Sequence, residues 1–173
     1  MKLSGYYKEQ GNNVILKLDY ENLSQYDKIF ISKVFTDTPI DESILTLPNV
    51  EHGGTGFFYD KAPSLPCEIE HHMPDYHLYD DWVKQKILEG VKPKDLSYYT
   101  DYSIGFTTRG CIRQCSFCVN RNYKQASIHS PIAEFYDKSR PYICLLDDNI
   151  LACKDWKLIF KELEATGKRF QFK

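Results

Sequence analysis

The chain has 173 residues, of which 42% are hydrophobic, and its 22 Lys and Arg against 24 Asp and Glu give a formal net charge of −2. This composition excludes collagen-like chains, disulfide-rich miniproteins and wholly disordered chains, and the length allows one ordinary domain or two small ones. No apolar run is long enough to span a bilayer and residues 1–10 lack the core of a signal peptide, so we expect a cytoplasmic protein with reduced thiols and no membrane partner.

The first half predicts a small α/β domain over residues 1–90. Residues 13–18 (NVILKL) and 28–34 (KIFISKV) are short β-branched runs between polar residues, and both predict strands. The glycine-rich segment 53–56 (GGTG) predicts a tight turn, because a lone glycine cluster is a weak signal for phosphate binding. These features are compatible with strands of a parallel sheet.

A helix is predicted in the second part of residues 74–90, with Gly90 as its C-terminal stop. Residues 91–98, which include Pro93, predict a linker. The helix is recognised by apolar residues that share one side, namely Trp82, Val83, Ile87 and Leu88.

The second half alternates strands and helices. Residues 102–107 and 142–146 predict buried strands, residues 154–166 predict an amphipathic helix, and a third strand begins at residue 169. This order is typical of βα units in a parallel sheet. Because the chain stops inside the last strand, we expect it to be a fragment of a longer protein.

A basic stretch runs from Tyr102 to Ala133 without any acidic residue. Its positive charge favours an anionic partner such as a nucleic acid, a phosphate, a carboxylate or a negatively charged metal cluster. The cations within it are Arg109, Arg113, Arg121 and Lys124.

Three cysteines in this stretch, Cys111, Cys115 and Cys118, form a C-x3-C-x2-C pattern directly after a predicted strand. A structural zinc site needs four ligands, and the nearest histidine, His129, lies eleven residues beyond Cys118. Cubane iron–sulfur clusters usually take four cysteines, so three would leave one iron open to a substrate or cofactor. The other cysteines predict core positions for Cys144 and Cys153 and no role for Cys67.

The segment from Gly105 to Cys118, GFTTRGCIRQCSFC, resembles the signature loop of the radical S-adenosylmethionine enzymes. The resemblance implies that Cys111, Cys115 and Cys118 bind a 4Fe-4S cluster, that its fourth iron holds S-adenosylmethionine, and that Phe117 lies against the adenine. In that family an electron from the cluster cleaves the cofactor to a 5′-deoxyadenosyl radical, which abstracts hydrogen from a substrate. A flavodoxin- or ferredoxin-like reductase would supply the electron.

The resemblance continues in the strand that ends at residues 147–149. It implies that Asp147, Asp148 and Asn149 meet the methionine part of S-adenosylmethionine, although these residues could equally cap the following helix. The implied fold is α/β, with a small Rossmann-like leading domain (1–90), the linker 91–98, and the first βα units of a partial TIM-type barrel (99–173). The Asp-x-His-x-x-Gly motif of cobalamin-binding domains is missing, so cobalamin is not expected.

Two other functions fit the same residues. One is an iron–sulfur electron carrier or redox sensor, and the other is a zinc-dependent RNA-binding module without catalysis. The four cations could balance a cluster and cofactor, or they could hold an anionic substrate such as RNA. The histidines His52, His71, His72 and His77 predict ordinary loop residues rather than a metal site.

Overall fold

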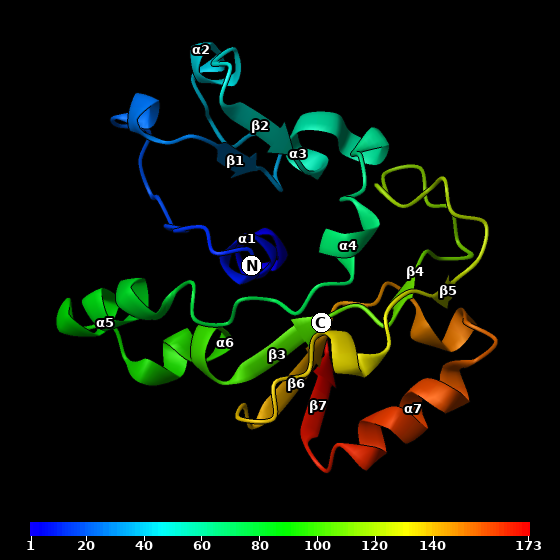
Figure 1. Cartoon of the computed structure of the whole chain (residues 1–173). Coiled ribbons are helices and arrows are strands. Elements are labelled where there is room, and N and C mark those ends of the chain that lie inside the picture. The colour runs from blue at the N-terminus through cyan, green and yellow to red at the C-terminus, as the bar shows by residue number, and fades with distance from the viewer. The chain divides into compact units, whose positions relative to one another are not determined.

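A computed structural model describes residues 1–173, which adopt a mixed α/β fold (Figure 1). The chain divides into two compact units. The first unit comprises residues 1–16, 66–113 and 123–173, and the second comprises residues 17–65 and 114–122. This division differs from the predicted boundary at 91–98, because residues 1–16 and 66–90 pack within the same unit as most of the second half.

The helices and strands are short. The first unit contains α1 (Lys2–Glu9), α4 (Cys67–Glu70), α5 (Asp80–Leu88), α6 (Ser97–Thr100), α7 (Trp156–Ala165), β3 (Tyr102–Gly105), β4 (Thr108–Arg109), β5 (Ser127–Ile128), β6 (Tyr142–Leu145) and β7 (Arg169–Phe172). The second contains β1 (Ile29–Ser32), α2 (Glu42–Leu45), β2 (Val50–Gly53) and α3 (Thr55–Phe58). Short 3-10 turns lie at Leu23–Gln25, Tyr59–Lys61, Pro93–Leu96, Ile132–Glu134 and Ile150–Ala152.

The centre of the first unit is a parallel sheet with the strand order β3-β6-β7. Ile143 and Leu145 of β6 are fully buried against Ile159 and Leu163 of α7, and this contact forms the core. The predicted strands at 102–107, 142–146 and 169 and the predicted helix at 154–166 are therefore confirmed. In each of these elements the apolar residues recur on one side, and burial of that side stabilises the element.

Residues 91–98 are structured rather than a linker. They form the 3-10 turn Pro93–Leu96 and enter α6, and Leu96 is 5% exposed. The helix α5 forms as predicted, but only Val83 of its apolar side is buried, whereas Leu88 is 89% exposed. The predicted apolar side of this helix is therefore wrong in its last turn.

The helix α1 was not expected from the sequence. Its Gly5 lies so close to Met73 that a Cβ atom there would come 2.5 Å from the Met73 carbonyl oxygen. The helix also contacts α4. Packing of this glycine-containing helix against Met73, 68 positions away, and against α4 therefore stabilises α1 more than local propensity does.

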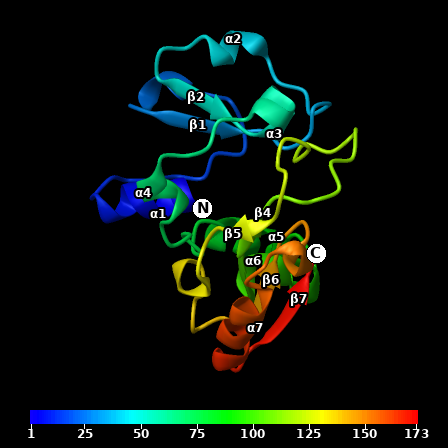
Figure 2. The same cartoon turned by 90° about the vertical axis from the view of Figure 1, so that its right-hand side faces the viewer.

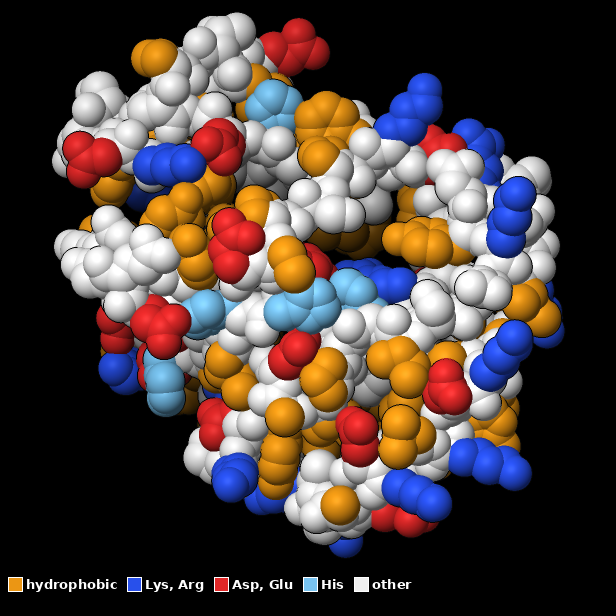
Figure 3. Space-filling view, turned by 45° about the vertical axis from the view of Figure 1, so that its right-hand side comes forward, with side chains coloured by type: hydrophobic (Ala, Val, Ile, Leu, Met, Phe, Trp, Pro, Cys, Tyr) orange, Lys and Arg blue, Asp and Glu red, His pale blue; other side chains and the backbone are white.

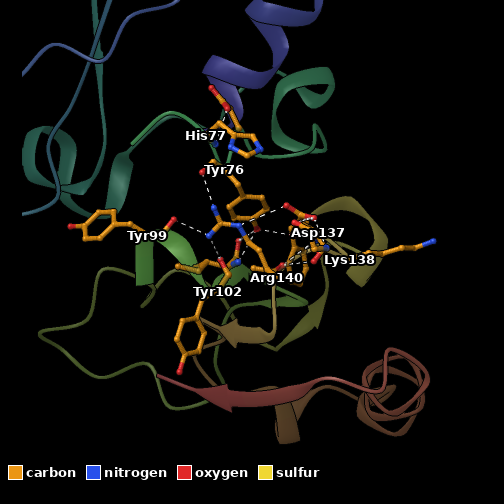
Figure 4. A network of polar contacts seen from close by, with 12 residues as sticks. Tyr76, His77, Tyr99, Tyr102, Asp137, Lys138 and Arg140 are labelled. Atoms are coloured by element: carbon orange, nitrogen blue, oxygen red, sulfur yellow. Dashed lines mark hydrogen bonds and ion pairs between the residues drawn. The ribbon is translucent and has the colours of Figure 1, made fainter. Parts of the chain in front are cut away.

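A buried arginine joins three segments of the first unit (Figure 4). Arg140, which is 5% exposed, donates hydrogen bonds to the main-chain oxygens of Tyr76, Tyr99 and Tyr102 over 2.7 to 3.1 Å. Its guanidinium also lies 4.4 Å from the centre of the Tyr76 ring and 3.8 Å from the Asp137 carboxylate. The charge is thus solvated by carbonyl oxygens instead of water.

The second unit holds a two-stranded parallel sheet, in which Ile29 of β1 is in register with Val50 of β2, and Figure 2 shows α2 and α3 near β2. The strand predicted at 28–34 is confirmed as β1. The strand predicted at 13–18 is wrong, because these residues pair with no other strand and Ile15 and Leu18 are more than half exposed. The predicted glycine turn is present and leads directly into α3, with Gly54 at φ +103°.

Candidate functional site

The loop that carries the three cysteines leaves and re-enters the first unit through a two-stranded stem. Thr108 and Arg109 of β4 pair antiparallel with Ile128 and Ser127 of β5. The loop begins at Gly110, whose φ is +92° and whose missing Cβ would lie 2.4 Å from the main-chain oxygen of Gln125. Only glycine fits this backbone and this close approach, so the two ends of the loop are tightly apposed.

Asp147 ties the stem to the end of the parallel sheet. Its buried carboxylate accepts hydrogen bonds from the main-chain N–H and the hydroxyl of Thr107 and from the same two groups of Thr108. Both threonines are at most 1% exposed. The end of β6 is thereby fixed to the turn that leads from β3 into β4, and the hydrogen-bonding capacity of Asp147 is used within the protein.

Asn149 and Cys111 are brought together by this arrangement. The Asn149 side-chain amide donates to the Cys111 sulfur at 3.7 Å, although the two residues lie 38 positions apart. Asp148, between Asp147 and Asn149, is exposed. Of the three residues predicted to meet a cofactor, one therefore supports the stem and another touches a predicted cluster ligand.

Cys115 and Cys118 belong to the second unit, whereas Cys111 belongs to the first. The main-chain N–H of Cys118 donates to the Cys115 oxygen at 3.0 Å, and the main-chain N–H of Asn120 donates to the Cys118 sulfur at 3.4 Å. All three thiols are free and half-buried. The structure gathers no group of three or more His, Cys, Asp or Glu side chains in an arrangement that could hold a metal ion.

The donor set nevertheless has the chemistry that an iron–sulfur cluster requires. Cluster ligands are thiolates, and N–H donors to their sulfurs stabilise the negative charge. Two of the three sulfurs, those of Cys111 and Cys118, already accept an N–H donor. Phe117 exposes 82% of its surface, so its ring is available to a ligand.

The tip of the loop is anchored within the second unit by residues 59 and 60. The Tyr59 hydroxyl donates to the Phe117 main-chain oxygen at 2.7 Å. Arg121 contacts the Asp60 carboxylate at 2.7 Å, and the Asn122 amide donates to the Asp60 main-chain oxygen at 3.2 Å. The guanidinium of Arg121 lowers the pKa of the Asp60 carboxyl through this hydrogen bond.

The acid-free stretch is therefore not a uniformly free positive surface. Arg121 pairs with Asp60, and Arg109 lies 3.6 Å from the Glu70 carboxylate, while no ion pair holds Arg113 or Lys124. Carboxylates from the first half of the chain balance half of its charge. A free anionic partner would meet mainly the two unpaired cations.

Histidines of the first unit pair with carboxylates, and Figure 3 shows several pale blue histidine side chains with red Asp and Glu side chains near them. The hydrogen bond from His129, together with the charges of Lys2 and Arg109, lowers the pKa of Glu70 to about 2. The pairs are His71 with Glu134, His72 with Glu9, His77 with Asp80 and His129 with Glu70. Each of these four histidines therefore contacts a different carboxylate.

Sequence reasoning missed Tyr59, Asp60 and Glu70 as residues of this region. They lie 39 to 62 positions before their partners, and no pattern in the sequence connects them. The predictions for the remaining cysteines are confirmed where they concern burial, because Cys144 and Cys153 are 0% and 2% exposed. Cys67 is exposed at the start of α4.

Comparison with protein families, with curated proteins and with solved structures gives no match. None of the helices combines the length and the apolar character needed to cross a membrane.

Proposed function

We propose that this chain is a radical S-adenosylmethionine protein whose C-x3-C-x2-C loop holds a 4Fe-4S cluster. The observation that carries the proposal is the set of three free thiols in a loop that follows β3, with N–H donors on two of the sulfurs. Such a loop at the carboxyl ends of parallel strands is where α/β proteins hold their ligands.

The finer fold assignment belongs to the same proposal. We take β3, β6 and β7 as the first strands of a partial (β/α) barrel and the leading residues as a degenerate Rossmann-like domain without cobalamin. The strands support this because they are parallel and lie in the sheet in the order in which they occur along the chain, with α7 in the connection between β6 and β7.

Each of these residues would have a separate role in binding the cluster and the cofactor. Cys111, Cys115 and Cys118 would ligate the cluster, which when bound supplies one electron for reductive cleavage of S-adenosylmethionine. Phe117 would lie against the adenine, and Asn149 would donate a hydrogen bond to the Cys111 sulfur. Asp147 would act indirectly, because it holds Thr107 and Thr108 at the base of the loop.

Partners follow from the same chemistry. A flavodoxin- or ferredoxin-like reductase would supply the electron. Arg113 and Lys124, which have no ion pair, would be the cations that face an anionic substrate such as RNA.

The test is electron paramagnetic resonance of anaerobically reconstituted, dithionite-reduced protein with and without S-adenosylmethionine. The wild type is compared with Cys115→Ala and with the matched control Cys67→Ala, which removes an exposed thiol outside the loop. We expect a 4Fe-4S signal that changes on adding the cofactor, its loss in Cys115→Ala and its retention in Cys67→Ala.

Each other result selects a different function. A cluster signal that does not change when S-adenosylmethionine is added would favour an electron carrier or redox sensor. One colourless zinc with salt-dependent RNA binding and no cluster would favour the zinc module and would refute the radical proposal.

A further inference from the structure

Two residues that close the cysteine loop share one carboxylate oxygen. Arg109, the last residue of β4, places Nη2 3.6 Å from Oε1 of Glu70. His129, which follows β5, places Nε2 2.9 Å from the same oxygen. Glu70, at the end of α4, therefore bridges both strands of the stem from a segment that is distant in sequence.

Glu70 is itself held in place from the other side. Lys2 of α1 donates to the Glu70 main-chain oxygen and lies 3.5 Å from Oε1. The Glu70 side chain is only 17% exposed, and its neighbour Ile69 is 6% exposed. A carboxylate that is fixed by packing and charge can fix its partners in turn.

Its two stem partners are also restrained. The Arg109 guanidinium lies 3.5 Å from the centre of the Phe106 ring, and the main-chain N–H of His129 donates to the Thr107 oxygen at 2.8 Å. Both groups therefore approach Glu70 from defined positions. The stretch between Tyr102 and Ala133 contains no acid of its own, so Glu70 supplies the negative charge that the stem lacks.

We propose that Glu70 is a positioning residue for the cysteine loop, because it locks the two strands of the loop's stem to each other. It makes no hydrogen bond to Cys111, Cys115 or Cys118 and acts through Arg109 and His129. Its importance for a cluster rests on the proposed function, whereas its hold on the stem does not. Removal of the carboxylate would let the ends of the stem at Arg109 and His129 open more often and would make Cys111 and the loop beyond it more mobile, although Asp147 still holds Thr107 and Thr108.

The first measurement uses the metal-free full chain and trypsin. Cleavage after Arg113, Arg121 and Lys124 reports opening of the loop and is followed by mass spectrometry. In Glu70→Ala we expect these cleavages to be about tenfold faster than in the wild type, as for the loss of one hydrogen bond to a charged group. Glu9→Ala is the matched control, since Glu9 pairs with His72 at 2.8 Å and contacts neither strand of the stem.

The second measurement is the electron paramagnetic resonance signal of the reconstituted, reduced variants. We expect an altered line shape and a lower iron content in Glu70→Ala, and wild-type values in Glu9→Ala. If circular dichroism shows that Glu70→Ala does not fold, His129→Ala removes the same contact from a half-buried position after β5 and must accelerate cleavage likewise.

The two proposals fail separately. Wild-type cleavage rates and an unchanged signal in the folded variant would overturn the role of Glu70, even where the cluster responds to S-adenosylmethionine. Faster cleavage in Glu70→Ala with no cluster in the wild type would uphold the role of Glu70 in the stem and would refute the radical proposal.

Discussion

Replacing Asp147 by alanine tests whether this carboxylate serves the fold or a cofactor. The change removes the acceptor for four hydrogen bonds, two from main-chain N–H groups and two from hydroxyls. The hydroxyls of Thr107 and Thr108 can rotate toward other acceptors. Their main-chain N–H groups cannot, because both residues are at most 1% exposed.

The expected loss of stability follows from the main-chain N–H groups of Thr107 and Thr108, which would remain buried without an acceptor. A buried donor without an acceptor costs ~1–3 kcal/mol, so Asp147→Ala should lower the free energy of unfolding by about 3 kcal/mol. With a urea dependence of ~2 kcal/mol per molar, the midpoint should fall by about 1.5 M. This is a large share of the ~5–15 kcal/mol that stabilises an ordinary domain.

Urea titration followed by tryptophan fluorescence measures the effect in the correct unit, because Trp82 and Trp156 both belong to the first unit. The control is Glu164→Ala on the exposed side of α7, which should change the free energy by no more than ~0.5 kcal/mol. A loss below ~1 kcal/mol in Asp147→Ala would refute the reasoning, since it would mean that Thr107 and Thr108 do not depend on this carboxylate.

Two further predictions concern aromatic residues. Tyr76 is 3% exposed, and its hydroxyl donates to the Phe135 oxygen at 2.6 Å and accepts from the Ile104 N–H at 2.8 Å. Tyr76→Phe should therefore cost ~1–2 kcal/mol in urea titration, and an unchanged midpoint would contradict the assigned bonds. Burial raises the pKa of Tyr76 from 10.0 to about 12, so the wild type loses stability as the pH rises through this range, where the unfolded chain releases the proton first. That loss should be smaller in Tyr76→Phe. Phe117→Ala removes a ring that is 82% exposed, so stability should stay within ~0.5 kcal/mol while the spectral response of the reduced cluster to S-adenosylmethionine weakens. A full response in Phe117→Ala would remove the adenine contact from the proposal.

Secondary structure is predicted best from the sequence where the residues that become buried also recur at the spacing of a helix or a strand. Residues 142–146 and 154–166 form β6 and α7 because their apolar residues meet in one core. Residues 13–18 have an equally strand-like pattern, but a strand also needs a partner, and none lies beside them. Pairing and packing between distant segments likewise explain why α1 and the β4–β5 stem were not predicted.

The candidate site shows the same limit. The cysteine spacing is local and visible in the sequence, and so is the absence of acids around it. The residues that hold the loop, Glu70 and Asp60, are single carboxylates among many in the first half of the chain. Only the folded arrangement distinguishes them from carboxylates on the solvent-facing surface.

The buried Arg140 also has a consequence for the order of events in folding. Its guanidinium can leave water only when replacement oxygens are present, and these come from residues 76, 99 and 102. A partly assembled state that buried the ion with one of the three segments missing would carry much of its desolvation cost. The segments must therefore close around the ion together, which couples the backbone around residues 76, 99, 102 and 140 into one cooperative transition and makes the protected amide protons of these segments exchange as a group.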